Sequence, residues 1–172
     1  CIRDRGTTMT RYLLDSNIII NAVRLYPRDV FPSYWTSLEN FVTAKTFFFH
    51  YSVQEELERR KDSVSAWFRS FVPQDQILHV DNDEIESYRR LSTWVAFDRV
   101  PRFDEAAVRE FLDDAADSWL VASAHARNMS IITDEKSQPR RINRVKLPDA
   151  AAALGVQCST YLDFLRSRGI TY

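Results

Sequence analysis

Short apolar runs alternate with amphipathic stretches along this chain, and the alternation predicts strands separated by helices. The first apolar run, Tyr12–Leu14, ends at the carboxylate of Asp15, and a second apolar stretch starts directly after Ser16 and Asn17. This pattern is typical of a buried strand that is followed at once by a helix. Active sites collect at the carboxyl ends of the strands in open parallel sheets. We therefore expect a functional site around Asp15.

Aromatic and β-branched runs predict further strands, and helices are expected between them. The strands are predicted at residues 46–51, 76–80, 129–133 and 156–158. The helix after the second strand is expected to begin with Ser52 as its N-cap, in a Ser-Val-Gln-Glu capping box. Residues 117–126 are apolar nearly all round, which predicts a buried helix. The expected fold class is α/β, a Rossmann-like three-layer α/β/α sandwich with a small parallel sheet.

The length of 172 residues is enough for one domain with a sizeable core, and no linker or repeat divides the chain. We expect a single domain over residues 9–172. Residues 1–8 precede Met9, so they are expected to be an N-terminal extension, either an alternative start or an added remnant. No apolar run approaches the roughly 20 residues that a membrane-spanning helix needs, so no membrane partner is expected.

Charge and cysteine content narrow the function classes. The net charge is -1, so any affinity for nucleic acid must come from a local patch. Cys1 and Cys158 are the two cysteines, which does not support a disulfide framework. A reducing, cytoplasmic location is therefore expected.

Acidic residues from distant segments are predicted to meet at one edge of the sheet. Asp15 ends the first strand, Glu56 lies on the helix after the second, and Asp117 opens the buried helix. Asp134 or Glu135 follows the strand that contains Ile131 and Ile132. Each alone has a structural explanation, as a helix cap, a solvated helix face, a charge at a helix N-terminus or a turn. Together they would repel one another and raise each other's pKa unless a cation neutralised them.

The cluster therefore predicts a site for Mg²⁺ or Mn²⁺, which prefer carboxylate oxygens and water. Ser16 and Asn17 add a hydroxyl and an amide that would hold a metal-bound water. The sequence contains no zinc-like His/Cys spacing, no Gly-rich phosphate loop and no Gly-x-Ser-x-Gly elbow. Carboxylate-held metals suit in-line attack of water on a phosphodiester. A basic stretch follows, which is either a solvated loop or a phosphate contact, and consists of Lys136, Arg140, Arg141, Arg144 and Lys146.

In this order and spacing, the acidic segments resemble the motifs of the PIN domain, the nuclease fold of VapC-type toxins. The matching segments are 14–17, 52–57, 117–124 and 131–135. The family usually writes its last motif Thr-x-Asp, so Glu135 rather than Asp134 takes the acidic position, with Glu in place of Asp. Segments 25–35 and 146–156 resemble one PIN-like branch of unestablished function that is commonly encoded beside antitoxins.

The resemblance implies a Mg²⁺- or Mn²⁺-dependent endoribonuclease, the toxin of a type II toxin–antitoxin pair. Such a toxin acts on RNA, is inhibited by a cognate protein antitoxin and is often a homodimer. The resemblance assigns metal binding to Asp15, Glu56, Asp117 and Glu135, and the positioning of water or phosphate to Ser16, Asn17 or Thr133.

Two alternatives remain open at this stage. The replacement of Asp by Glu135 permits a PIN-like RNA- or protein-binding module with little or no catalysis. A phosphoaspartate enzyme with Asp15 as its nucleophile is the other alternative, but Asn17 stands where that chemistry needs a second Asp.

Overall fold

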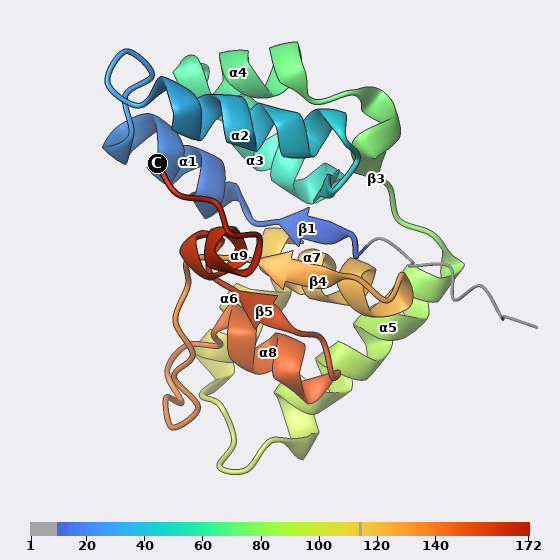
Figure 1. Ribbon diagram of the computed structural model, residues 1–172. Coiled ribbons are helices and arrows are strands. Elements are labelled where there is room, and N and C mark those ends of the chain that lie inside the picture. Colours follow the sequence, from blue (N-terminus) through green and yellow to red (C-terminus); the bar gives the residue numbers. More distant parts are fainter. Residues whose placement is uncertain (1–9, 114) are drawn as a thin grey trace, which may run out of the picture.

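A small parallel sheet organises the computed structural model, which describes residues 10–113 and 115–172. Over these residues the sheet has five strands in the order β3-β2-β1-β4-β5 (Figure 1). Their bounds are β1 Tyr12–Leu14, β2 Phe47–His50, β3 Ile77–Leu78, β4 Ser130–Ile132 and β5 Cys158–Ser159. The strand order reverses beside β1, which pairs with β2 on one side and β4 on the other. Such a reversal opens a crevice at the carboxyl ends of the strands.

Helices connect the strands and cover both faces of the sheet. In Figure 1, α9 lies in front of the strands and α7 behind them. The ring of Phe164 in α9 meets Phe41 edge to face and Phe47 at a tilt, which places α9 next to α2 and β2. The helices are α1 Ser16–Leu25, α2 Pro32–Thr43, α3 Tyr51–Arg59, α4 Ser63–Phe71, α5 Asn82–Thr93, α6 Glu105–Asp113, α7 Ala115–Ala126, α8 Leu147–Ala153 and α9 Tyr161–Ser167. The expected three-layer α/β/α architecture with a small parallel sheet is confirmed.

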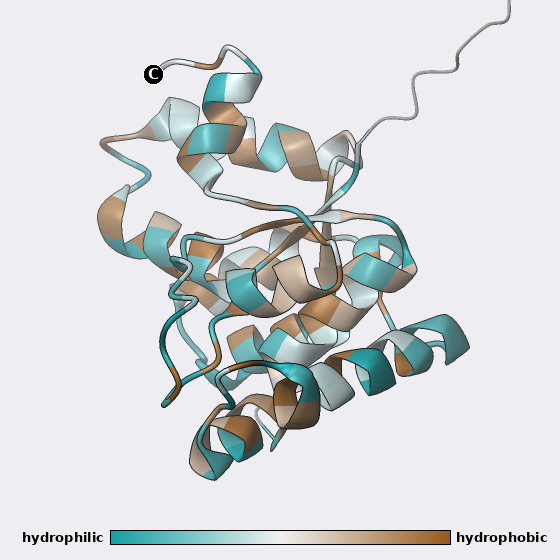
Figure 2. Cartoon of the chain, turned by 90° about the horizontal axis from the view of Figure 1, so that it is seen from below, coloured by the Kyte–Doolittle hydropathy of each residue, from teal (hydrophilic) through white to brown (hydrophobic). Residues whose placement is uncertain are grey.

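The apolar positions of the sequence form the core between these layers. Leu13 and Leu14 of β1 are fully buried, and so are Leu120, Val121 and Ala124 of α7, which confirms that this helix lies inside the molecule. Hydrophobic and hydrophilic residues are interleaved along the other helices (Figure 2), as expected for helices with one face toward a core and one toward water.

The predicted N-cap of α3 is wrong. The helix begins at Tyr51, and His50 is its N-cap, because the His50 ring nitrogen Nδ1 accepts a hydrogen bond from the Ser52 backbone N–H at 3.2 Å. The capping-box pattern pointed to Ser52, but the Ser52 hydroxyl lies 2.7 Å from the same ring nitrogen. A histidine at the end of the strand thus takes the place that a serine, threonine or aspartate usually holds.

The predicted N-terminal extension, residues 1–8, lies outside the described residues. None of the helices in the described part of the chain has the length and apolarity needed to cross a bilayer.

Candidate active site

A pocket of about 440 Å³ lies at the carboxyl ends of β1 and β4 and contains every carboxylate that the sequence predicted for the site. The lining residues come from α1, α3, α7 and the segments after β1 and β4. They are Asp15, Ser16, Asn17, Asn21, Glu56, Ala116, Asp117, Asp134, Glu135 and Arg144. The fold therefore brings together side chains that are up to 120 positions apart in the chain, from Asp15 to Glu135.

Asp15 occupies the N-cap position of α1, but its side chain makes no capping hydrogen bond. Instead, its Oδ2 atom accepts hydrogen bonds from Asn17 Nδ2 at 2.8 Å and from Thr133 Oγ1 at 2.7 Å. The Oδ1 atom accepts a long hydrogen bond of 3.4 Å from the Ser16 hydroxyl. Helix capping, the structural alternative for this residue, is thus not what the carboxylate does, and one of its oxygens retains strong acceptor capacity toward the pocket.

Burial raises the pKa of Asp15 to about 6, although the hydrogen bond from Thr133 acts in the opposite direction. The negative charges of Glu56 and Glu135 raise this pKa further. A carboxylate that is 6% exposed and faces two others is costly to ionise in the absence of a counter-charge. Its environment is therefore one that a bound cation would stabilise.

Thr133 and Asn17 join the turn after β1 to the turn after β4. Asn17 Nδ2 donates to Thr133 Oγ1 at 3.2 Å, and Asn17 Oδ1 accepts from the Asp134 backbone N–H at 3.2 Å. Thr133 Oγ1 also accepts from the Glu135 backbone N–H at 3.0 Å. These contacts show that both side chains orient Asp15 and the segment that carries the last carboxylates.

Glu56 and Asp117 reach the pocket from two helices. On α3, Glu56 is half-buried whereas its neighbour Glu55 is exposed, because the helix turns its Val53 and Leu57 face toward the core. Asp117 is half-buried in the first turn of α7. The helical periodicity of α3 therefore turns Glu56 toward the pocket and leaves Glu55 and Glu58 exposed to solvent.

Asp134 and Glu135 both line the pocket, but they accept hydrogen bonds from different parts of the protein. Glu135 accepts from Lys146 Nζ at 2.7 Å and from the Leu147 backbone N–H at 2.8 Å. Asp134 accepts from Asn21 Nδ2 at 3.2 Å and from the Tyr161 backbone N–H at 3.4 Å, which ties it to α1 and α9. Of these two residues, Glu135 is the one whose charge helps to raise the pKa of Asp15.

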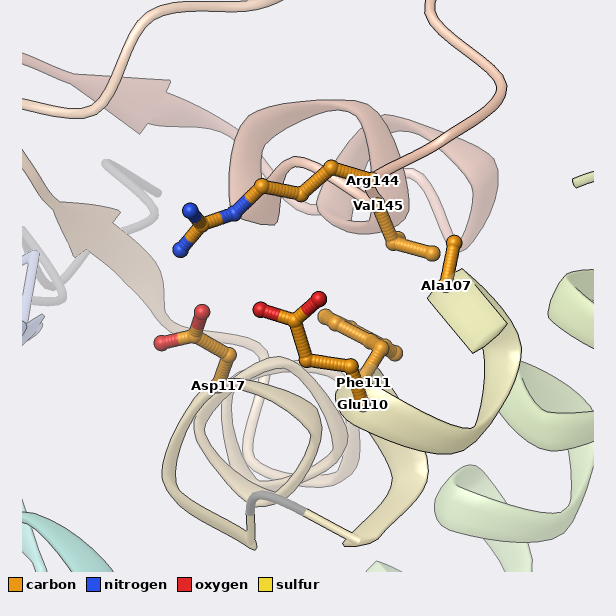
Figure 3. A pocket seen from close by; sticks show the side chains of 6 residues that line it. All are labelled: Ala107, Glu110, Phe111, Asp117, Arg144 and Val145. Carbon is orange, nitrogen blue, oxygen red and sulfur yellow. The ribbon is translucent and has the colours of Figure 1, made fainter. Parts of the chain in front are cut away.

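The basic residues after Glu135 separate into two groups. Arg144 lines the pocket, and its guanidinium points toward the carboxylates of Asp117 and Glu110 (Figure 3). Lys146 pairs with Glu135 at 2.7 Å. Of the remaining basic residues, Arg140 and Lys136 are exposed, and the Arg141 side chain bonds to Asn143 and Gln138 within its own loop.

Sequence reasoning missed two residues near the pocket. Asn21 lies one helical turn after Asn17, so its presence on the same face of α1 follows from helical spacing. Glu110 of α6 lies with Asp117 and Arg144 in an adjoining small cavity (Figure 3). No sequence signal distinguishes Glu110, because it belongs to the exposed face of an amphipathic helix.

The donor chemistry of the pocket suits a hard divalent cation. Its polar lining, over the described residues, consists of carboxylate, hydroxyl and amide groups and one guanidinium, without imidazole or thiolate. Within residues 10–113 and 115–172, however, no group of three or more His, Cys, Asp or Glu side chains is placed closely enough to form a ready-made metal site. The carboxylates share one pocket, and protein donors bind Asp15, Asp134 and Glu135 there.

One of the solved structures similar to this chain, with a TM-score of 0.55, supports this architecture. A search of curated protein sequences found no match. A chain from the crystal structure of VapBC2 from Rickettsia felis, bound to a DNA fragment from its promoter, is 18% identical, with a TM-score of 0.55 over 88% of this chain and 99% of that chain. A chain of FitAcB from Neisseria gonorrhoeae is also 18% identical, with a TM-score of 0.48 over 86% of this chain and 95% of that chain. At such low identity the likeness concerns the fold alone.

The family comparison gives the identity of the chain. The model of a domain of unknown function, DUF4411, matches residues 12–172. This range includes all five strands of the described sheet and every residue of the candidate active site. The chain therefore belongs to the DUF4411 family.

Proposed function

We propose that this protein is a Mg²⁺- or Mn²⁺-dependent endoribonuclease that hydrolyses RNA phosphodiester bonds. The observation that carries the proposal is the meeting of Asp15, Glu56, Asp117 and Glu135 in one pocket, from four separate segments. The raised pKa of Asp15 supports it, because a cation in the pocket would relieve the repulsion between these carboxylates.

The residues of the pocket have separate tasks in this proposal. Asp15, Glu56, Asp117 and Glu135 would hold the metal, and Asn17 and Thr133 keep Asp15 oriented. The bound metal supplies a water of lowered pKa and neutralises charge on the phosphate. Arg144 and Lys146 stand at the same pocket or beside it, where they would contact the phosphates of the RNA.

We also propose that the protein is the toxin of a type II toxin–antitoxin pair, with a cognate protein antitoxin as its partner. The likeness in fold to a chain of VapBC2 from Rickettsia felis supports this proposal. The cytoplasmic location, expected from the cysteine content, and the homodimer, implied by the sequence resemblance, belong to the same proposal.

The first prediction concerns Asp15→Asn, which keeps the size of the side chain but removes its charge. Wild-type protein is expected to cleave single-stranded RNA only with Mg²⁺ or Mn²⁺, and the variant is expected to be inactive, because a neutral amide is a poor ligand for these cations. Cleavage is followed on a labelled RNA with each metal and with a chelator. Cleavage by purified Asp15→Asn, after contaminating nuclease has been excluded, would contradict the proposal.

A second candidate function is a PIN-like RNA- or protein-binding module with little or no catalysis. The observation that favours it is that Lys146 and the Leu147 backbone N–H already occupy both oxygens of Glu135. This candidate predicts RNA binding that is unchanged by chelator and is not followed by cleavage.

A further inference from the structure

A second cavity, of about 280 Å³, adjoins the candidate active site. The two share Asn21 and Asp134, so they have a common border at the end of β4. Large side chains of α1, α2 and α9, and Tyr26 directly after α1, form most of the remaining walls. They are Leu25, Tyr26, Tyr34, Tyr161 and Leu162. We refer to this cavity as the tyrosine pocket.

The aromatic rings of the tyrosine pocket pack against one another. The rings of Tyr26 and Tyr34 stack with centroids 4.4 Å apart and an interplanar angle of 11°. Tyr161 meets Tyr34 edge to face at 5.5 Å, and both side chains are almost completely buried. The pocket is therefore preformed, and a ligand would not have to order these rings on binding.

The rim of the tyrosine pocket combines exposed apolar surface with charged side chains of both signs, Asp134 and Asp163 beside Lys136 and Arg166. Leu25 and Leu162 are 52% and 49% exposed, so two large apolar side chains remain in water beside the cavity. Lys136 lies on the same rim, directly after Glu135. The other cation of the rim, Arg166, is paired with Asp163 at 2.8 Å. A ligand that covers the leucines and also carries negative charge next to Lys136 fits this combination.

We propose that the tyrosine pocket is a nucleobase subsite, which takes one unpaired base next to the scissile phosphate of single-stranded RNA. The inference rests on the proposed nuclease function. With a phosphate among the carboxylates, the common border at Asp134 directs a neighbouring nucleotide into the second cavity. Its base would lie against the tyrosine and leucine walls, and Lys136 would face the phosphate of that nucleotide.

The subsite selects for single-stranded RNA. A base inside a duplex is paired and stacked, so it cannot enter a cavity walled by protein side chains. A partner protein segment is the competing occupant of an apolar cavity. The continuity with the catalytic carboxylates and the position of Lys136 favour a nucleotide.

The test uses a single-stranded RNA with one mapped cleavage site, in which each base near that site is replaced in turn by an abasic ribose. Wild-type protein should lose roughly tenfold in kcat/KM at one flanking position, because the base would cover the exposed apolar surface of Leu25 and Leu162. Leu162→Glu places a charge on the exposed rim of the pocket. This variant should lose a similar factor on the intact RNA and should no longer distinguish the abasic RNA.

Ile85→Glu is the matched control, because Ile85 is another exposed apolar residue of a helix, α5, away from both cavities. It should keep the wild-type rate and the wild-type abasic profile. The subsite is overturned if no flanking position is sensitive in wild-type protein. It is also overturned if Leu162→Glu keeps the wild-type profile, which is the result expected when the pocket serves a partner protein.

A binding measurement can test the nucleobase subsite separately from the proposed nuclease activity. Asp15→Asn is mixed with the fluorescently labelled intact and abasic RNAs, and the dissociation constants are compared by anisotropy. Roughly tenfold weaker binding of the abasic RNA, lost when Leu162→Glu is added, supports the subsite even if wild-type protein cleaves nothing and the nuclease proposal fails. Equal affinities for the two RNAs, or no RNA binding, overturn the subsite.

Discussion

At the scale of single residues, Asp15 has the backbone position of a helix cap, but its side chain does not cap the helix. The residue stands at the N-cap of α1, yet its carboxylate turns to Asn17 and Thr133 and into a pocket with other carboxylates. The result is a pKa raised to about 6, chiefly by burial. Such an environment costs stability when the carboxylate is ionised, so it is informative about function.

The second prediction follows from the sign of this pKa shift. Because the pKa of Asp15 is higher in the folded state than in the unfolded chain, folding favours its protonated form, and its contribution to stability falls as pH rises from about 4 through about 6. At pH 7.5, without metal, Asp15→Asn should therefore raise the free energy of unfolding by about 1–3 kcal/mol relative to its effect at pH 4.5. Urea unfolding of both proteins at the two pH values measures this difference. An equal effect at both pH values would show that Asp15 ionises freely.

The third prediction compares two neighbouring residues of α3. Glu56 lines the pocket and Glu55 is exposed. Glu56→Gln should lower kcat on RNA on the order of 100-fold or more, because groups that only support a metal ligand are already worth about 10–100-fold. Glu55→Gln should leave the rate nearly unchanged. Equal rates for the two variants would remove Glu56 from the site.

At the scale of elements, a buried network fixes the end of β2 and the start of α3. His50 Nε2 lies 2.7 Å from Glu84 Oε1, and both side chains are almost fully buried. Arg127, which follows α7, reaches the other oxygen of Glu84 at 2.5 Å. The network thus ties α5 and α7 to the strand whose last residue caps the helix that carries Glu56.

The fourth prediction concerns this network. Glu84→Gln removes the buried negative charge between His50 and Arg127. Arg127 keeps Asp81 as a partner, so the variant should lower the free energy of unfolding by about 1.5–3 kcal/mol. Glu86→Gln is the control, since Glu86 forms a solvent-exposed ion pair with Arg89 at 3.5 Å. Such pairs contribute about 0–1 kcal/mol. Comparable losses for the two variants in urea unfolding would mean that the buried network does not stabilise the fold.

At the scale of the whole molecule, the pattern of hydrophobic residues was enough to predict most of the fold. Strand–helix alternation was sufficient to predict the parallel sheet, and the apolar stretch from Asp117 to Ala126 predicted the buried helix. These predictions succeed because burial follows from local periodicity. The His50 cap was missed because it depends on an interaction with Glu84, more than 30 positions away along the chain.

Part of the candidate site, too, is predictable from the sequence and part is not. Carboxylates that follow strands are visible in sequence, and the fold does bring them into one pocket. The pairing of Glu135 with Lys146 and the approach of Arg144 to Asp117 depend on how loops and helices pack, which local patterns do not encode. For the same reason the tyrosine pocket, assembled from three helices, left no signal in the sequence.

A crystal grown with Mn²⁺ would test the central claim most directly, because the anomalous signal of the metal locates it and identifies its ligands. We expect a Mn²⁺ peak in the pocket, bound by Asp15 together with Glu56, Asp117 or Glu135, with Glu135 released from Lys146. A fully loaded crystal without a peak among these carboxylates would contradict the account.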